Sequence, residues 1–376
     1  MTMSRRTVIG LGLLGVSAAA TTGVVAFRDS PLLRGVIGDV NTLRGYAGGE
    51  KMAFIANPHT IAALRHRGLA LAAERAGSVE QVRDPALLGT HPQFLWPSSS
   101  PLVELARQNA KVLRDQVIFN SPIVVYSWQP IADGFVRAGL ATKEGAHYFI
   151  DAKGLIDAAL SRKSWADLGQ ADLYGHVRLI ATDPNKSNSG FMFAGLAANL
   201  LAGDVATTET LGDVLPKLTS LFRDMGFKTS SSGKVFDDFI AGGPGAEPLV
   251  VGYENQLVEW ILEDPARWHR VEAAAGAARP VALYPRPTAY SAHPLIALAS
   301  ESFALIDALV SPELQTIGWR DHGFRGPLGT IGSDTNPLIA GRMPQQITAV
   351  APMPDMEVML RVLDALAPLK PGGATP

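Results

Sequence analysis

The stretch DPNKSNSG, residues 183–190, gathers small polar side chains where an apolar run gives way to an expected helix. Ser187, Asn188 and Ser189 can donate or accept hydrogen bonds without blocking a ligand, and Gly190 lets the backbone come close. The first turn of a helix has N–H groups without intrahelical partners and a partial positive charge. The loop therefore suits a small polar solute, and an oxyanion is among the candidates.

The same residues have a plainer interpretation. A helix needs only one N-cap residue, and either Ser187 or Ser189 could fill that role. The loop nevertheless supplies Ser, Asn and Ser in succession after Asp183 and Pro184, and Lys186 could add a full positive charge. From the residues alone, both the cap and the ligand contact stay open.

Two other loops have a similar form. In WPSSSP, Ser98, Ser99 and Ser100 follow an apolar run and precede an expected helix, which is typical of either a binding loop or a turn with a serine cap. Asn57 stands between an expected strand and an expected helix, although an Asn before Pro is most often a turn residue. We include all four as candidate ligand contacts.

The segment VVGYENQ adds an aromatic and an acidic candidate. Tyr253 could stack on a solute or hydrogen-bond to it, whereas Glu254 at a helix start is also a common helix-dipole residue. If Glu254 faced the solute, its charge would oppose a dianion and favour a neutral or cationic molecule. Tyr284 and Tyr290 are further candidate aromatics, with core packing as the alternative.

Other chemistries have little support in the sequence. The chain has no cysteine, which removes disulfides, thiolate metal sites and thiol nucleophiles. No metalloprotease, nucleophile-elbow or dinucleotide-binding motif occurs, and the scattered histidines do not suggest a zinc site. The segment GFKTSSSGKV resembles a phosphate loop, but its glycines are too far apart and Val235 replaces the required Ser or Thr. We therefore predict no catalytic residue, no metal and no cofactor.

Length and composition indicate a globular protein. The 376 residues suffice for one large or two ordinary domains, 47% are hydrophobic, 18% are charged and the net charge is -2. Because a nucleic-acid partner demands a basic excess, we exclude DNA and RNA as partners.

The N-terminus predicts an export or anchoring segment, residues 1–28. Arg5 and Arg6 precede an uncharged run from Thr7 to Phe27, and SRRTVIG partly resembles a twin-arginine signal. The small residues of VSAAATTG favour cleavage, while the length of the run also fits a membrane anchor that contacts the bilayer through residues 7–27. Either outcome places the rest of the chain outside the cytoplasm.

A connector ends at residue 50. After it, short apolar runs alternate with longer amphipathic ones, and these elements would position the loops described above. Strands are expected at 52–56, 92–96, 116–128, 177–182, 248–253 and 280–285. Helices are expected at 58–77, 101–114, 154–169, 191–203, 254–264 and 356–369, with one or two helices interrupted by Pro216 at 208–226. Residues 294–323 are expected to be helical only. This alternation predicts an α/β fold with parallel sheets covered on both faces.

Three segments carry a resemblance to a known family: SPIVVYSWQPIADGFVRAGL, KSWADLGQADLYGHVRLIATDPNKSNSG and PLVVGYENQLVEW. In this order and spacing, the chain resembles bacterial extracytoplasmic solute-binding proteins of the type II periplasmic-binding-protein fold over roughly residues 50–330. That family has two lobes with a ligand cleft between them. The resemblance implies that the chain crosses between lobes at SPIVVYSW and again at VALYPRPTAY.

The resemblance therefore implies lobe one at 40–125 plus 291–376 and lobe two at 126–290. It favours ligand contact over a simple cap for Ser187 and its neighbours. The leading functional hypothesis is capture of a small polar solute for delivery to a membrane transporter, with an ABC transporter permease as the candidate partner. A membrane-tethered sensor or scaffold is the alternative, and an exported hydrolase is less well supported.

Overall fold

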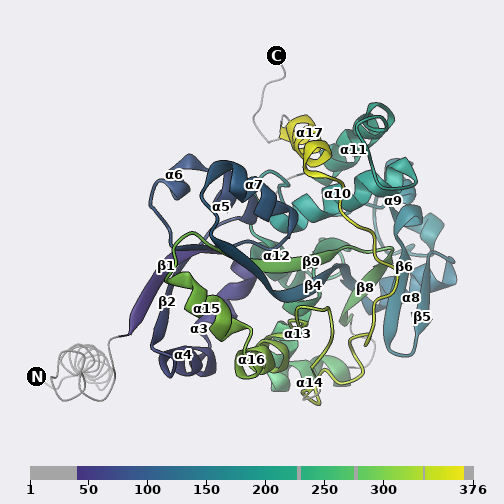
Figure 1. The fold of residues 1–376 in the computed structure, drawn as a ribbon. Helices are drawn as coiled ribbons and strands as arrows, with labels where there is room; N and C mark the ends of the chain where they lie inside the picture. The colour runs from purple at the N-terminus through teal and green to yellow at the C-terminus, as the bar shows by residue number, and fades with distance from the viewer. Residues whose placement is uncertain (1–39, 227–229, 275–277, 333–334, 368–376) are drawn as a thin grey trace, which may run out of the picture.

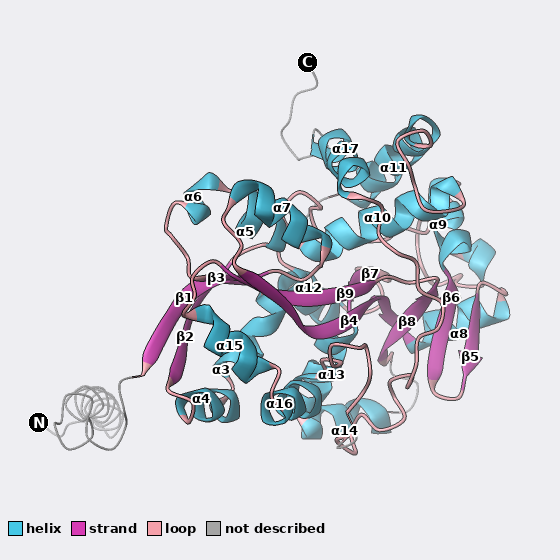
Figure 2. Ribbon diagram, viewed as in Figure 1, coloured by secondary structure: helices cyan, strands magenta, loops and turns pink. Residues whose placement is uncertain are grey.

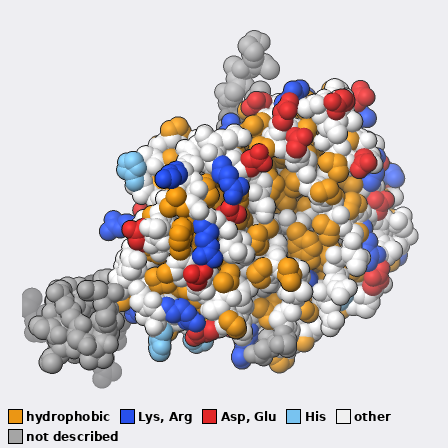
Figure 3. All heavy atoms as spheres, in the orientation of Figure 1, with side chains coloured by type: hydrophobic (Ala, Val, Ile, Leu, Met, Phe, Trp, Pro, Cys, Tyr) orange, Lys and Arg blue, Asp and Glu red, His pale blue; other side chains and the backbone are white. Residues whose placement is uncertain are grey.

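The computed structural model describes residues 40–226, 230–274, 278–332 and 335–367 (Figure 1). The predicted signal or anchor at 1–28 lies outside these residues. Within the described ranges, no helix combines the length and the apolar character needed to cross a bilayer. On the face seen in Figure 3, acidic and basic side chains are interspersed around a group of hydrophobic ones near the middle.

A nine-stranded sheet runs through the described part of the chain, in the order β2-β1-β3-β9-β4-β8-β6-β5, and β7 pairs with β4. Its strands are β1 (Asn41–Ala47), β2 (Leu69–Arg75), β3 (Phe94–Trp96), β4 (Arg114–Trp128), β5 (Ala141–Glu144), β6 (His147–Asp151), β7 (Val250–Tyr253), β8 (Pro280–Arg286) and β9 (Tyr290–Ala297).

The long strand β4 joins the two halves of this sheet. Its first part pairs antiparallel with β9, from Arg114 opposite Ala297 to Pro122 opposite Tyr290. Its second part, from Ile123 onward, pairs antiparallel with β7 and β8. The segment SPIVVYSW, predicted as the outward crossing, therefore lies where β4 leaves β9 and enters the second half of the sheet (Figure 2).

Helices cover both faces of the sheet, with α5, α7 and α10 on one side and α4, α15 and α16 on the other (Figure 2). Their bounds are α3 (Met52–Ala56), α4 (Pro58–Arg65), α5 (Ser78–Arg83), α6 (Pro85–Leu88), α7 (Pro101–Asn109), α8 (Gln129–Arg137), α9 (Ala152–Leu160), α10 (Asn188–Ala202), α11 (Leu211–Met225), α12 (Ser232–Gly242), α13 (Glu254–Glu263), α14 (Pro265–Ala273), α15 (Ser302–Leu309), α16 (Pro312–His322) and α17 (Met356–Leu366), with short 3-10 helices η1 (Gly49–Lys51) and η2 (Ala166–Leu168).

The apolar core forms two clusters. The smaller one packs under β1, β3 and the α3, α15 and α16 helices, around Phe54, Phe119 and Leu305. The larger one extends from Tyr46 and Leu102 to residues of α10, α11, α13 and α17, and so includes both predicted lobes. Helix α10 is apolar nearly all round and buried over most of its length, as expected for a helix enclosed by others.

The structure corrects several predicted elements near the N-terminus of the described part. Residues 52–56, predicted as a strand, form helix α3, since a short apolar run does not reveal its own period. The helix predicted at 58–77 ends at Arg65, and its Ala-rich second half is strand β2, which pairs in parallel with β1. Strand β1 itself was missed because its residues were interpreted as a connector.

Other corrections concern the middle and the end of the chain. Residues 177–182 form no sheet strand and contribute only an isolated bridge between Ile180 and Val250. Helix α11 continues through Pro216 instead of breaking there. Residues 294–297, expected to be helical, complete strand β9.

The sheet is mixed, which corrects the expectation of parallel sheets. Only β1 with β2, β1 with β3, and β6 with β8 pair in parallel among the named strands. The reason is the β4–β9 pair, two long antiparallel strands that carry the chain between the two halves.

Candidate functional site

The loop that precedes α10 is organised by a residue that the sequence did not reveal. The Thr182 hydroxyl accepts a hydrogen bond from the Gly190 N–H (2.8 Å) and contacts the Ser189 hydroxyl (2.7 Å). Ser187 occupies the N-cap position of α10, but its side chain makes no cap hydrogen bond. The simple cap interpretation of Ser187 and Ser189 is therefore not supported, because Thr182 takes that role.

Gly190 is needed for a structural reason. A Cβ at this position would lie 2.3 Å from the carbonyl oxygen of Thr182, far inside van der Waals contact. The glycine thus allows the loop and the first turn of α10 to pack closely. This close packing keeps Ser187 and Asn188 at the start of the helix.

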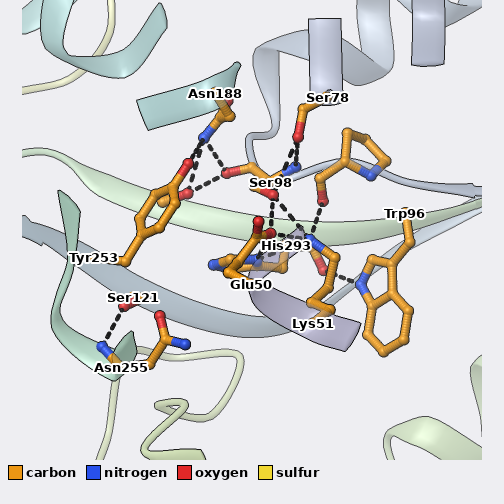
Figure 4. A network of polar contacts seen from close by, with 12 residues as sticks. Glu50, Lys51, Ser78, Trp96, Ser98, Ser121, Asn188, Tyr253, Asn255 and His293 are labelled. Carbon is orange, nitrogen blue, oxygen red and sulfur yellow. Dashed lines mark hydrogen bonds and ion pairs between the residues drawn. The ribbon is translucent and has the colours of Figure 1, made fainter. Parts of the chain in front are cut away.

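Asn188 links this loop to the other half of the molecule. Its Nδ2 contacts the carbonyl oxygen of Ser98 (2.7 Å), the hydroxyl of Ser291 (3.0 Å) and the hydroxyl of Tyr253 (3.1 Å) (Figure 4). Ser98 and Ser291 belong to predicted lobe one, whereas Asn188 and Tyr253 belong to predicted lobe two. One buried amide therefore connects the two halves.

A buried ionic cluster lies beside Ser98, and it consists of residues that sequence reasoning missed. The Lys51 ammonium contacts the Ser98 hydroxyl (2.8 Å) and pairs with the Glu50 carboxylate, to which Ser98 also donates. His293 Nδ1 lies 3.5 Å from Glu50 Oε1, and the Ser78 hydroxyl donates to Ser98 (3.1 Å) (Figure 4). Lys51 and His293 are fully buried.

Burial and mutual attraction set the charges in this cluster. Burial raises the pKa of Glu50, but Lys51 and His293 outweigh it and hold that pKa well below its usual value. Burial lowers the pKa of Lys51 against the attraction of Glu50, and burial together with the Lys51 charge lowers the pKa of His293 to about 4. The cluster thus contains one buried ion pair next to a neutral imidazole at pH 7.

Acidification is expected to destabilise the protein through His293. Because its pKa falls from 6.5 to about 4 on folding, the unfolded chain binds the proton more readily. The stabilisation is therefore complete above pH 6.5 and is lost as the pH falls toward 4, with about 3 kcal/mol at stake. Urea unfolding between about pH 7 and pH 4 should show a flatter pH dependence for His293→Gln than for the native chain. The exposed His66→Gln should keep the native slope, and an equal slope in all three proteins would contradict this assignment.

A small cavity lies along the seam between the two predicted lobes. Its volume is about 170 Å³. It is lined by Gly48, Gly49, Glu50, Arg75, Ala76, Gly77, Ser78, Glu80, Ser187, Asn188, Ser230, Ser231, Ser232 and Tyr253. Small and polar residues dominate this lining, so the cavity suits a small hydrogen-bonding molecule.

Two basic side chains, Arg75 and Lys186, lie near the acidic residues Glu50 and Glu80 of the cavity lining. The Arg75 guanidinium contacts the Ser231 hydroxyl at the start of α12. Lys186, which could add a full positive charge, lies 3.7 Å from the Glu80 carboxylate. The serines of GFKTSSSGKV thus border the cavity as a helix start, and not as a phosphate loop.

Several buried polar atoms along this seam have no hydrogen-bond partner among the described residues. They are the Ser99 hydroxyl, Asn188 Oδ1, both amide atoms of Asn255 and His293 Nε2. An unpaired buried polar group costs about 1–3 kcal/mol, so such groups usually have a water or ligand partner.

The remaining predicted residues are placed as follows. Ser100 is exposed. The Asn57 side chain caps α4 by accepting from His59 N–H (2.8 Å) and contacts His322 (2.9 Å), away from the seam cavity. Tyr290 is partly buried beside Gly329.

Glu254 does not face the seam cavity. Its carboxylate is buried and forms an ion pair with Arg325 (Nε to Oε2, 2.6 Å; Nη2 to Oε1, 2.8 Å), and Tyr284 donates to it (2.8 Å). Because Glu254 does not face the cavity and Arg325 compensates its charge, Glu254 does not disfavour an anionic solute there.

No metal site emerges from the described residues, since no group of three or more His, Asp or Glu side chains there could hold an ion. The seam instead offers side-chain hydroxyls and the Asn188 amide. This set favours reversible binding of a polar molecule.

No protein-family model matches the chain, and comparison with curated proteins finds no match. Among solved structures, a periplasmic thiamin binding protein matches with 13% identity, a TM-score of 0.60, and coverage of 89% of this chain and 96% of the other. The apo ferric ion-binding protein A of Pasteurella haemolytica matches with 12% identity, a TM-score of 0.57, and coverage of 89% and 100%. A substrate binding protein of an ABC transporter from Agrobacterium tumefaciens matches with 16% identity, a TM-score of 0.54, and coverage of 88% and 95%.

These matches confirm the predicted fold class. The chain has the two-lobe α/β fold of type II periplasmic binding proteins. At these identities the likeness concerns the fold, and the solute must be argued from the site.

Proposed function

We propose that this chain is an extracytoplasmic solute-binding protein that holds a small polar solute in the seam cavity, between lobes at 40–125 plus 291–376 and at 126–290. The observation that carries this proposal is Asn188, one buried amide that joins both predicted lobes beside a polar cavity. A solute that hydrogen-bonds to residues of both predicted lobes in this cavity would stabilise the arrangement in which the lobes are close together.

The proposed role is binding without catalysis. The three structural neighbours named above are binding proteins, and one of them is the substrate binding protein of an ABC transporter. Delivery to a membrane permease is the corresponding proposal for this chain. The hydroxyl-rich lining, with Ser78, Ser187 and Ser232, favours an oxygen-rich solute.

A thermal-shift panel of oxyanions, sugars, amino acids and polyamines tests the proposal. A solute at about 100 times its Kd adds about 2.7 kcal/mol of stability. At least one class should therefore raise the melting temperature clearly. If none does, the solute-binding proposal fails and a scaffold function gains weight.

Replacing Ser187 and Ser189 with Ala should weaken the response to the stabilising solute. The unliganded variant should stay within about 2 kcal/mol of the native stability, because the Gly190 N–H still donates to the Thr182 hydroxyl. Isothermal titration with the panel's best solute measures the change in Kd. Ser300→Ala, at an exposed position, is the matched control, and an unchanged Kd in the double variant would remove this loop from the site.

A further inference from the structure

A second cavity lies outside the seam, and its volume of about 290 Å³ exceeds the 170 Å³ of the seam cavity. Helices α13 and α14, strand β8, the β5–β6 hairpin and residues 339–343 enclose it. Of the candidate solute contacts predicted from the sequence, only Glu254 and Tyr284 line it, and both side chains are buried.

Most of its wall is apolar. Leu257, Val258 and Ile261 line it from α13, and Ile339 and Met343 line it from the C-terminal segment. A cavity of this volume has room for roughly ten groups of water size, at about 30 Å³ each. It therefore suits a ligand with a short hydrocarbon body.

The cations at this cavity differ in their partners. Lys143 lies 3.5 Å from the Asp133 carboxylate, and Arg342 pairs with Glu272. Arg279, in contrast, borders the cavity half-buried, and its guanidinium has no carboxylate partner among the described residues. Its charge is therefore available to a ligand.

A second donor at the same cavity is also unpaired. Trp268 is 2% exposed, and its indole N–H has no acceptor among the described residues. The one carboxylate that borders the cavity, Glu254, is already engaged by Arg325 and Tyr284. Two hydrogen-bond donors without acceptors therefore lie next to an apolar wall. A ligand with anionic oxygens would supply the acceptors that these donors lack.

We propose that this cavity is a second binding site, distinct from the seam, for a small monocarboxylate with a short hydrocarbon chain. The carboxylate would bind Arg279 and the Trp268 indole N–H, and the hydrocarbon chain would lie against Leu257, Val258 and Met343. Such a site would respond to an amphiphilic acid independently of the polar solute in the seam.

Hexanoate tests this proposal, with hexanamide as its uncharged counterpart and acetate as the acid without a chain. Titration into the full chain, followed by Trp fluorescence and calorimetry, should show saturable binding of one hexanoate, at least about tenfold tighter than hexanamide or acetate. Absence of hexanoate binding, or equal binding of hexanamide, would overturn the proposal.

Three variants locate the binding. Arg279→Gln should abolish the preference for hexanoate over hexanamide, whereas Arg270→Gln, which removes an exposed charge outside the cavity, should not. Ala282→Leu should fill part of the cavity and block both ligands. If hexanoate binding is lost in the Ser187→Ala, Ser189→Ala variant and kept in Arg279→Gln, the acid occupies the seam and the second site does not exist.

Discussion

Replacing Arg325 with Met is expected to lower the free energy of unfolding by about 3–5 kcal/mol, the usual cost of removing one partner of a buried ion pair. Arg325 is fully buried and binds the Glu254 carboxylate with two nitrogens. Without the guanidinium, Glu254 would remain buried at 1% exposure, with the Tyr284 hydroxyl as its one remaining side-chain donor among the described residues.

The effect of Arg325→Met should extend to the C-terminal segment. The guanidinium also donates to the carbonyl oxygens of Pro344 (2.7 Å) and Gln345 (3.2 Å), which hold that segment against the site of the ion pair. Urea unfolding of the variant, with hydrogen exchange of residues 335–350, measures both consequences.

Two comparisons isolate the buried charge as the cause. Adding Glu254→Gln to Arg325→Met should recover part of the lost stability, because the unpaired charge is then removed. Arg361→Met breaks an exposed pair with Glu357 and should cost less than about 1 kcal/mol. If Arg325→Met and Arg361→Met lowered the free energy of unfolding by similar amounts, the buried ion pair would not be the cause of the loss in Arg325→Met.

Replacing Asn188 with Ala is expected to shift the unliganded protein toward an open arrangement of the lobes. The change removes the Nδ2 contacts to Ser98, Ser291 and Tyr253, of which the first two join the predicted lobes. At about 0.5–1.5 kcal/mol per hydrogen bond, loss of the two bonds between the predicted lobes should lower the ratio of closed to open molecules roughly tenfold. Affinity for the seam solute should fall by a similar factor.

The absence of native cysteine makes this opening directly measurable. Arg83→Cys on α5 and Ala241→Cys on α12 place spin labels at exposed positions on opposite sides of the seam cavity. The distance distribution should lengthen when Asn188→Ala is added. Asn109→Ala, which removes contacts to Val82 and Leu105 within one lobe, is the control. Equal distributions with and without Asn188→Ala would contradict the role of this amide.

Much of the site could be predicted because its residues follow local rules. Helix α10 begins after a run of small polar residues, and Tyr253 ends a short apolar strand just before α13. Ser98 follows β3 in the same manner. Loops at strand ends are where ligands bind in such sheets, so these loops were expected to meet. The structure brings Asn188, Tyr253 and Ser98 together, although the residues before the Asn188 loop form only an isolated bridge at Ile180.

The ionic cluster could not be predicted because it depends on distant pairing. Lys51 and Glu50 lie at the end of a segment that was interpreted as a connector, and His293 is on a strand whose partner β4 is far away in sequence. Nothing local distinguishes a buried lysine from an exposed one. The signal that could have been used is the pair Glu50-Lys51 directly after Gly48-Gly49, a tight turn at a strand end.

The conformation of the Ala-rich strand β2 also could not be predicted from its own residues. LALAAER has residues that favour helices, yet it pairs with β1 residue by residue from Leu69 to Arg75. Its conformation is decided by the neighbouring strand and by Leu69 and Leu71 packing on the core. Tertiary packing therefore overrides propensity here.

The long β4–β9 ladder has a consequence for how the molecule unfolds. Strand β4 contributes its first residues to one half of the sheet and its last residues to the other, and the larger core cluster spans both. Neither half retains its own complete set of strand neighbours once the other is lost. We therefore expect the two halves of the sheet to unfold together as one cooperative unit.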